Sequence, residues 1–202
     1  MANATQKATF PKSGSADLTW VFITGNGKKD LNGNDRYVAS LEFHKDDPAL
    51  AAIRAEIMAF WDANKPAGAK LPKSIGIKPV KDKDGNDTDK VNVNFWTGTH
   101  NQDGSAKVIK TYNAKGVEVA LGGKKIGNGS KGIISCTMGI FDQGVANRGV
   151  TLYLNAIQIT KFVEYVDGPG FSAVEDEDGW TGEDADTGFQ AQSEEPAAKP
   201  KL

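Results

Sequence analysis

The sequence predicts an all-β or α+β domain, made of short antiparallel strands and one main α-helix. Most apolar segments are short, rich in β-branched and aromatic residues, and separated by turn-forming residues. Glycine occurs 23 times in 202 residues, which is typical of a chain with many tight turns. A clear helical spacing of apolar residues is found in a single segment, and the chain length suits one domain with a small appendage.

The first half of the chain contains two expected strands and the helix. The strands, residues 18–24 and 37–43, are separated by glycine–asparagine turns. Asp47 can cap the helix and Pro48 fits its first position, while Pro66 ends it. Its apolar residues recur every three or four positions: Leu50, Ile53, Ile57, Phe60 and Trp61.

The second half of the chain returns to a strand pattern. We expect strands at residues 90–99, 117–121 and 132–141, and a long, bent strand or two strands at 151–166. Strands of this number around one helix favour an OB-fold, a five-stranded barrel, although other small β architectures fit the pattern as well.

Charge is distributed unevenly along the chain. Residues 1–166 carry 22 Lys and Arg against 16 Asp and Glu, a net charge of +6, and residues 167–202 carry 2 against 10, a net charge of −8. The second segment is poor in aliphatic residues, so we expect a barrel domain at 1–166 and a disordered acidic tail at 167–202. A basic body with an acidic tail indicates nucleic-acid chemistry.

Several classes of protein are excluded. Cys136 is the single cysteine, so no intramolecular disulfide can form, and no apolar segment is long enough to span a membrane. Residues 82–89 lack the spacing of a calcium-binding EF-hand, and residues 122–132 lack that of a Walker phosphate loop. No serine lies in a nucleophile motif, and we expect structural roles for both histidines. We therefore expect no catalytic activity, no metal and no cofactor.

Aromatic residues on polar strand faces carry the main functional signal. Side chains alternate between the two faces of a strand, which places Trp96 beside asparagines, Phe141 beside serine and threonine, and Tyr153 between threonine and asparagine. Exposed rings of this kind can stack on the bases of a single strand in a sequence-tolerant way. Trp20 and Tyr112 are weaker candidates, and packing under a loop or a subunit contact remains the alternative for each ring.

Basic residues complete the predicted interface. Of the 24 basic residues 21 are lysine, which favours contact with a phosphate backbone over the reading of base sequence. The glycine-rich segment 122–132 is either a mobile arm that touches a polyanion or a plain surface loop. The candidate phosphate-binding residues are Arg36, Lys110, Lys124, Lys125, Lys131 and Arg148.

The chain resembles the single-stranded DNA-binding proteins of tailed bacteriophages. The likeness covers most of the chain and is strongest in residues 132–180. This part contains the strand ending Gly139-Ile140-Phe141, the basic turn Asn147-Arg148-Gly149 and the strand containing Leu154-Asn155-Ala156. The last strand leads to Trp180 and the acidic tail. The resemblance implies an OB-fold core and binding of single-stranded DNA without sequence preference, in replication, recombination or repair. It also implies a location in the cytoplasm of the infected bacterial host. One departure is the C-terminus, which ends Lys199-Pro200-Lys201-Leu202 where family tails commonly end in acids and an aromatic residue.

The hypothesis of single-stranded DNA binding also predicts a role for the acidic tail and a set of binding partners. The acidic tail can compete with DNA for a basic groove, and on release it can recruit replication or recombination proteins. Self-association and weak binding of duplex DNA are compatible with the sequence. Two alternatives stay open: a virion β-barrel that uses the rings as a subunit interface, and a small β-barrel nuclease, which would need clustered carboxylates and a divalent metal.

Overall fold

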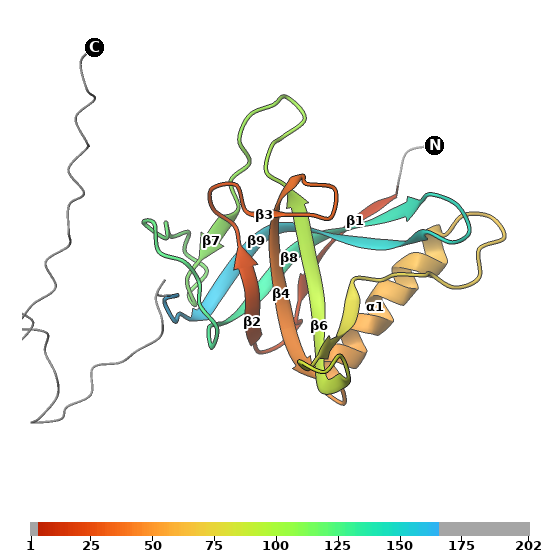
Figure 1. The fold of residues 1–202 in the computed structure, drawn as a ribbon, viewed down its shortest axis with the longest axis horizontal. Coiled ribbons are helices and arrows are strands. Elements are labelled where there is room, and N and C mark those ends of the chain that lie inside the picture. Colours follow the sequence, from red (N-terminus) through yellow and green to blue (C-terminus); the bar gives the residue numbers. More distant parts are fainter. Residues whose placement is uncertain (1–3, 166–202) are drawn as a thin grey trace, which may run out of the picture. The chain divides into compact units, whose positions relative to one another are not determined.

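The computed structural model describes residues 4–165, so the predicted disordered tail at 167–202 lies outside the described residues. The described part contains one helix and nine strands (Figure 1). In chain order they are β1 (Thr5–Phe10), β2 (Ala16–Phe22), β3 (Lys28–Lys29), β4 (Asp35–His44), α1 (Pro48–Asn64), β5 (Ile77–Lys81), β6 (Asp87–Gly98), β7 (Lys110–Tyr112), β8 (Lys131–Asp142) and β9 (Arg148–Lys161).

Five of these strands close into a barrel. β2, β4 and β6 pair antiparallel in that order, and β8 pairs antiparallel with both β9 and β2. The ring closes through a short parallel contact between β6 and β9, in which Trp96 faces Tyr153. The order β2-β4-β6-β9-β8 is the strand order of an OB-fold, so the predicted fold class is confirmed.

The barrel interior is filled by alternate residues of each strand, as the sequence predicts. Val93 and Phe95 of β6 are buried, while Trp96, the next residue of the same strand, faces outward with part of its surface exposed. Cys136 lies in the same core, and its burial raises the pKa of the thiol to about 12. The thiol is therefore protonated at neutral pH and packs as a small apolar group.

Helix α1 forms as predicted and covers the barrel next to β8 and β9. The Asp47 carboxylate accepts a hydrogen bond from the backbone N–H of Ala49 at 2.8 Å, and Pro48 occupies the first turn. The five apolar residues named above are all buried. Within residues 4–165, no helix combines the length and the apolar character that a membrane crossing requires.

The structure differs from the predicted elements in several places, and β1, β3, β5 and β7 were not predicted. The strand predicted at 117–121 is wrong: a turn at Asn113 folds Val117 back, and only a single bridge joins Tyr112 to Glu118. The residues near this segment that pair in the sheet are those of β7, Lys110–Tyr112, which runs parallel to β9. β9 itself ends at Lys161, whereas the long strand was expected to reach 166.

Candidate nucleic-acid interface

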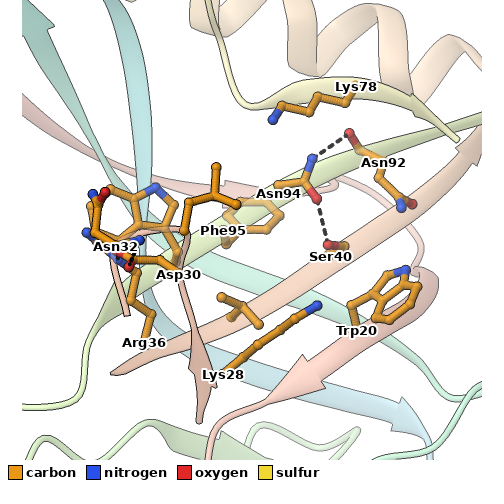
Figure 2. Close-up of a pocket in the computed structure, with 13 residues that line it drawn as sticks. Trp20, Lys28, Asp30, Asn32, Arg36, Ser40, Lys78, Asn92, Asn94 and Phe95 are labelled. Atoms are coloured by element: carbon orange, nitrogen blue, oxygen red, sulfur yellow. Dashed lines mark hydrogen bonds and ion pairs between the residues drawn. The ribbon is translucent and has the colours of Figure 1, made fainter. Parts of the chain in front are cut away.

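The outer face of β2, β4 and β6 carries a groove of about 600 Å³ (Figure 2). The connection between β2 and β4, residues 23–34, forms one side of it and includes the short strand β3. In OB-folds the face of the second and third barrel strands, with the loop between the first two, is the usual position of an oligonucleotide. The lining residues include Trp20, Lys28, Asp30, Arg36, Lys78, Asn92, Asn94 and Trp96.

Trp20 stands at one side of this groove in an unusual backbone conformation. Its φ angle is +52°, in the left-handed region that residues other than glycine rarely adopt, and the β2–β4 register shifts at this point. Its side chain is 59% exposed. Lys28 of β3 lies over it, with Nζ 4.9 Å from the centre of the ring. A strained backbone that holds an exposed tryptophan beside a cation is typical of a binding site.

Trp96 forms a second aromatic position in the groove. The Arg36 guanidinium lies 4.0 Å from its ring centre, a cation–π stack. Tyr153 meets the same tryptophan edge-on from β9, with 5.4 Å between ring centres. The Tyr153 ring in turn lies against Gly139, where a Cβ atom would come within 2.9 Å of Cε2. The absence of a side chain at Gly139 therefore permits this position of the ring.

Asp30 holds Arg36 in place. Its carboxylate accepts hydrogen bonds from the backbone N–H groups of Asn32 and Asn34, each at 2.9 Å, and from Nε of Arg36. The Arg36 hydrogen bond, followed by that of the Asn34 backbone, holds the pKa of this carboxyl well below its usual range. Asp30 therefore remains charged at neutral pH and fixes the guanidinium over the Trp96 ring.

The floor of the groove between the two tryptophans is polar. Ser40 Oγ donates to Asn94 Oδ1 at 2.8 Å, and Asn94 Nδ2 donates to the carbonyl oxygens of Gly76 and Asn92 at 3.2 and 3.3 Å. The amide of Asn94 is thus held by protein partners on both sides. Lys78 enters from β5, directly opposite Asn92 in the β5–β6 register.

The structure brings only some of the predicted residues together. Trp20, Arg36 and Trp96 line the groove, and Tyr153 contacts Trp96. Phe141 lies further along the β8–β9 ladder, opposite Gly149, and Tyr112 lies on β7 opposite Gln158. Neither of these two rings lines the groove.

The other predicted basic residues do not line the groove, and four of them lie near carboxylates. Lys110 contacts Glu118 at 2.8 Å, Lys124 contacts Glu164 at 2.9 Å, Lys131 contacts Asp17 at 2.8 Å, and Arg148 lies 3.8 Å from Asp142. Lys125 lies over the ring of Tyr165, with Nζ 5.8 Å from its centre. Exposed ion pairs are weak, so the exposed lysines among these can still exchange a carboxylate for a phosphate.

The glycine-rich segment 122–132 is attached to the barrel domain. Ile126 is buried, the backbone N–H of Gly127 donates to the carbonyl of Val163 at 2.8 Å, and Ser130 Oγ donates to the same carbonyl at 3.1 Å. These contacts favour the surface-loop interpretation of residues 126–130 over the mobile arm.

Sequence reasoning did not predict most of the residues that line the groove, among them Lys28, Asp30, Lys78 and Asn92. A signal existed for the first two, because a lysine and an aspartate between turn residues mark the tip of a connection between two strands. Lys78 lies on β5, which contains Pro79 and carries a weak strand signal, although an edge strand tolerates proline. No group of three or more His, Cys, Asp and Glu residues that could hold a metal ion occurs within residues 4–165.

Comparison with solved structures identifies the fold. The crystal structure of gp2.5, a single-stranded DNA-binding protein encoded by bacteriophage T7, matches 93% of this chain and 100% of its own, with a TM-score of 0.54 and 18% identity. The chain shares its fold with phage single-stranded DNA-binding proteins. The structure of the single-stranded DNA-binding protein from bacteriophage Enc34, in complex with single-stranded DNA, matches 79% of this chain and 88% of its own. The TM-score is 0.51 and the sequence identity is 13%. The structure of a C-terminally truncated form of the Enc34 protein matches 79% of this chain and 87% of its own, with a TM-score of 0.50 and 14% identity. No protein-family model and no curated protein sequence matches the chain.

Proposed function

We propose that this protein binds single-stranded DNA without catalysing a reaction. The observation that carries the proposal is the groove on β2, β4 and β6, where two tryptophans each lie beside a basic side chain. Its position matches the usual oligonucleotide face of an OB-fold. The phage proteins of the same fold, gp2.5 and the Enc34 protein, are single-stranded DNA-binding proteins, which supports the same conclusion.

Binding would combine base stacking with phosphate contacts. Trp20 and Trp96 offer ring faces to successive bases, and each stacked base contributes about 1–3 kcal/mol. Lys28 and Arg36, which lie on those rings in the free protein, would move to phosphates or stack with the bases themselves. Duplex DNA would bind weakly, because its bases are already stacked and paired.

The biological setting follows from the same proposal. A protein that coats single strands without catalysis serves the replication, recombination or repair of a phage genome, in the cytoplasm of the infected bacterial host. The acidic tail would modulate DNA binding and, once displaced, recruit replication or recombination proteins. Self-association along the DNA would be a further consequence of such coating.

Titration of the protein with fluorescently labelled oligo-dT at two salt concentrations tests the proposal. We expect binding that weakens as salt rises, with a logarithmic slope of about 0.7 for each phosphate neutralised on a single strand. A duplex of the same length serves as the control and should bind more weakly. No binding at low salt, by the full chain and by a chain ending at residue 166, would contradict the proposal and favour a structural β-barrel module.

Deletion of residues 167–202 should raise the affinity for oligo-dT at low salt. The deleted segment carries a net charge of −8 and competes with DNA for the basic groove at high effective concentration. Competition of this kind is electrostatic, so the difference between the two chains should shrink at high salt. Equal affinities of the full and shortened chains at low salt would leave the tail without a role in DNA binding.

A further inference from the structure

We propose that Asn92 and Lys78 form a base-reading subsite on the floor of the groove, which favours thymine and guanine over cytosine and adenine. This inference rests on the proposed function, because it assigns a specificity to the same groove. It concerns two residues that line the groove next to Asn94, and base stacking alone needs neither of them.

The two asparagines of the floor differ in their hydrogen bonds. Asn94 accepts from Ser40 and donates to two carbonyl oxygens, so its amide is saturated. Asn92 Oδ1 is buried, yet it accepts no hydrogen bond from the described residues. Buried polar atoms in native proteins nearly always have a partner, and an exception calls for an explanation. A ligand that supplies the missing donor in the bound state is such an explanation.

Lys78 adds a donor beside this acceptor. It stands directly opposite Asn92 in the antiparallel β5–β6 pair, so both side chains project from the same face of the sheet. Figure 2 shows the two side chains on the same side of the groove floor. Within residues 4–165 Lys78 makes no ion pair, in contrast to Lys90 of the neighbouring strand, which contacts Glu42 at 2.6 Å.

This combination matches the edge of a base that has a ring N–H beside a carbonyl group. The terminal torsion of asparagine is broad, so a small rotation turns Oδ1 toward a base in the groove. Oδ1 then accepts the ring N–H of thymine or guanine, and the Lys78 ammonium donates to the adjacent carbonyl oxygen. Cytosine presents a lone pair and an amino group at these positions, which would face the oxygen and the ammonium unfavourably. Adenine likewise lacks a ring N–H on its pairing edge.

The test compares oligo-dT, oligo-dC and an oligo-dT that carries 3-methylthymine, which lacks the ring N–H. We expect the full-length protein to bind oligo-dT about fivefold more tightly than the other two. Asn92→Leu, which keeps the size of the side chain, should remove this advantage by lowering the affinity for oligo-dT more than the affinity for oligo-dC. Lys78→Met, at an exposed edge-strand position, should reduce the same ratio.

Asn155→Leu is the matched control, because Asn155 lies on the outer barrel surface outside the groove and donates to Thr137 at 2.9 Å. It should keep the preference for oligo-dT. If the preference for oligo-dT survives in both Asn92→Leu and Lys78→Met, the inference is overturned. The preference would then come from base stacking and backbone flexibility. Equal binding of the three oligonucleotides by the wild-type protein would overturn it as well, while DNA binding would stand. No binding of any of them would reject the proposed function itself.

Discussion

Replacement of Trp20 with alanine or with glycine should weaken binding of oligo-dT by the same factor, about 5- to 150-fold, the equivalent of one lost base stack. The glycine variant should nevertheless be the more stable of the two proteins. Both variants lose the exposed ring and its contact with Lys28, but alanine keeps a Cβ atom at a φ of +52°. That conformation costs a residue with a Cβ about 1 kcal/mol, and glycine adopts it freely.

Anisotropy with labelled oligo-dT measures the affinity in this comparison, and urea unfolding measures the free energy of unfolding. Alanine is ordinarily the more stabilising residue in a regular strand, so a more stable glycine variant would isolate the backbone strain. Unchanged affinity in both variants would remove Trp20 from the interface. A more stable alanine variant would show that the cost of the positive φ is smaller than the usual advantage of alanine over glycine in a strand.

Replacement of Arg36 with alanine should lower the affinity for oligo-dT at low salt by about tenfold or more, beyond the loss of one phosphate contact. Arg36 covers the Trp96 ring and is also the partner of Asp30. Its removal leaves the Asp30 carboxylate, which still accepts the hydrogen bonds of the Asn32 and Asn34 backbone, as an unpaired negative charge in the groove. A negative charge at this position repels the phosphates of the DNA.

A second substitution separates the two causes of that loss. Asp30→Asn keeps an oxygen that can accept from the backbone N–H groups of Asn32 and Asn34 but removes the charge. We expect the double variant Asp30→Asn, Arg36→Ala to bind oligo-dT more tightly than Arg36→Ala alone, in a double-mutant cycle at low and high salt. A double variant no better than the single one would mean that Arg36 acts only through its own contacts.

The barrel and the helix could be predicted from the sequence because they depend on local patterns. Alternation assigned Val93 and Phe95 to the core and Trp96 to the outer face, and Asp47 with Pro48 marked the start of the helix. The strands that the sequence did not predict, β1, β3, β5 and β7, are edge elements; β3 has two residues, and β5 contains Pro79. Elements of this kind form because a neighbouring strand pairs with them, so their own residues carry little signal.

The candidate site could be predicted only in part, because its residues converge from distant segments. The outward position of Trp96 and Tyr153 follows from alternation, but their contact depends on the closure of the barrel. The role of Arg36 as a basic groove residue could be predicted, whereas its stack on Trp96 depends on the turn that Asp30 organises. Phe141 follows the same alternation as Trp96, but it pairs with Gly149, further along the β8–β9 ladder than Tyr153, and does not line the groove.

The closure of the barrel has a consequence for its internal motions. β6 and β9 are joined at a single pair, Trp96 and Tyr153, whereas β8 and β9 are paired along almost their whole length. Local opening of the barrel should therefore begin at this seam, where few backbone hydrogen bonds must break. The same pair carries two of the rings that we propose as part of the DNA interface, so a bound strand would span the seam and couple its opening to DNA release. Amide hydrogen exchange at this junction would then slow in proportion to the fraction of protein that is bound.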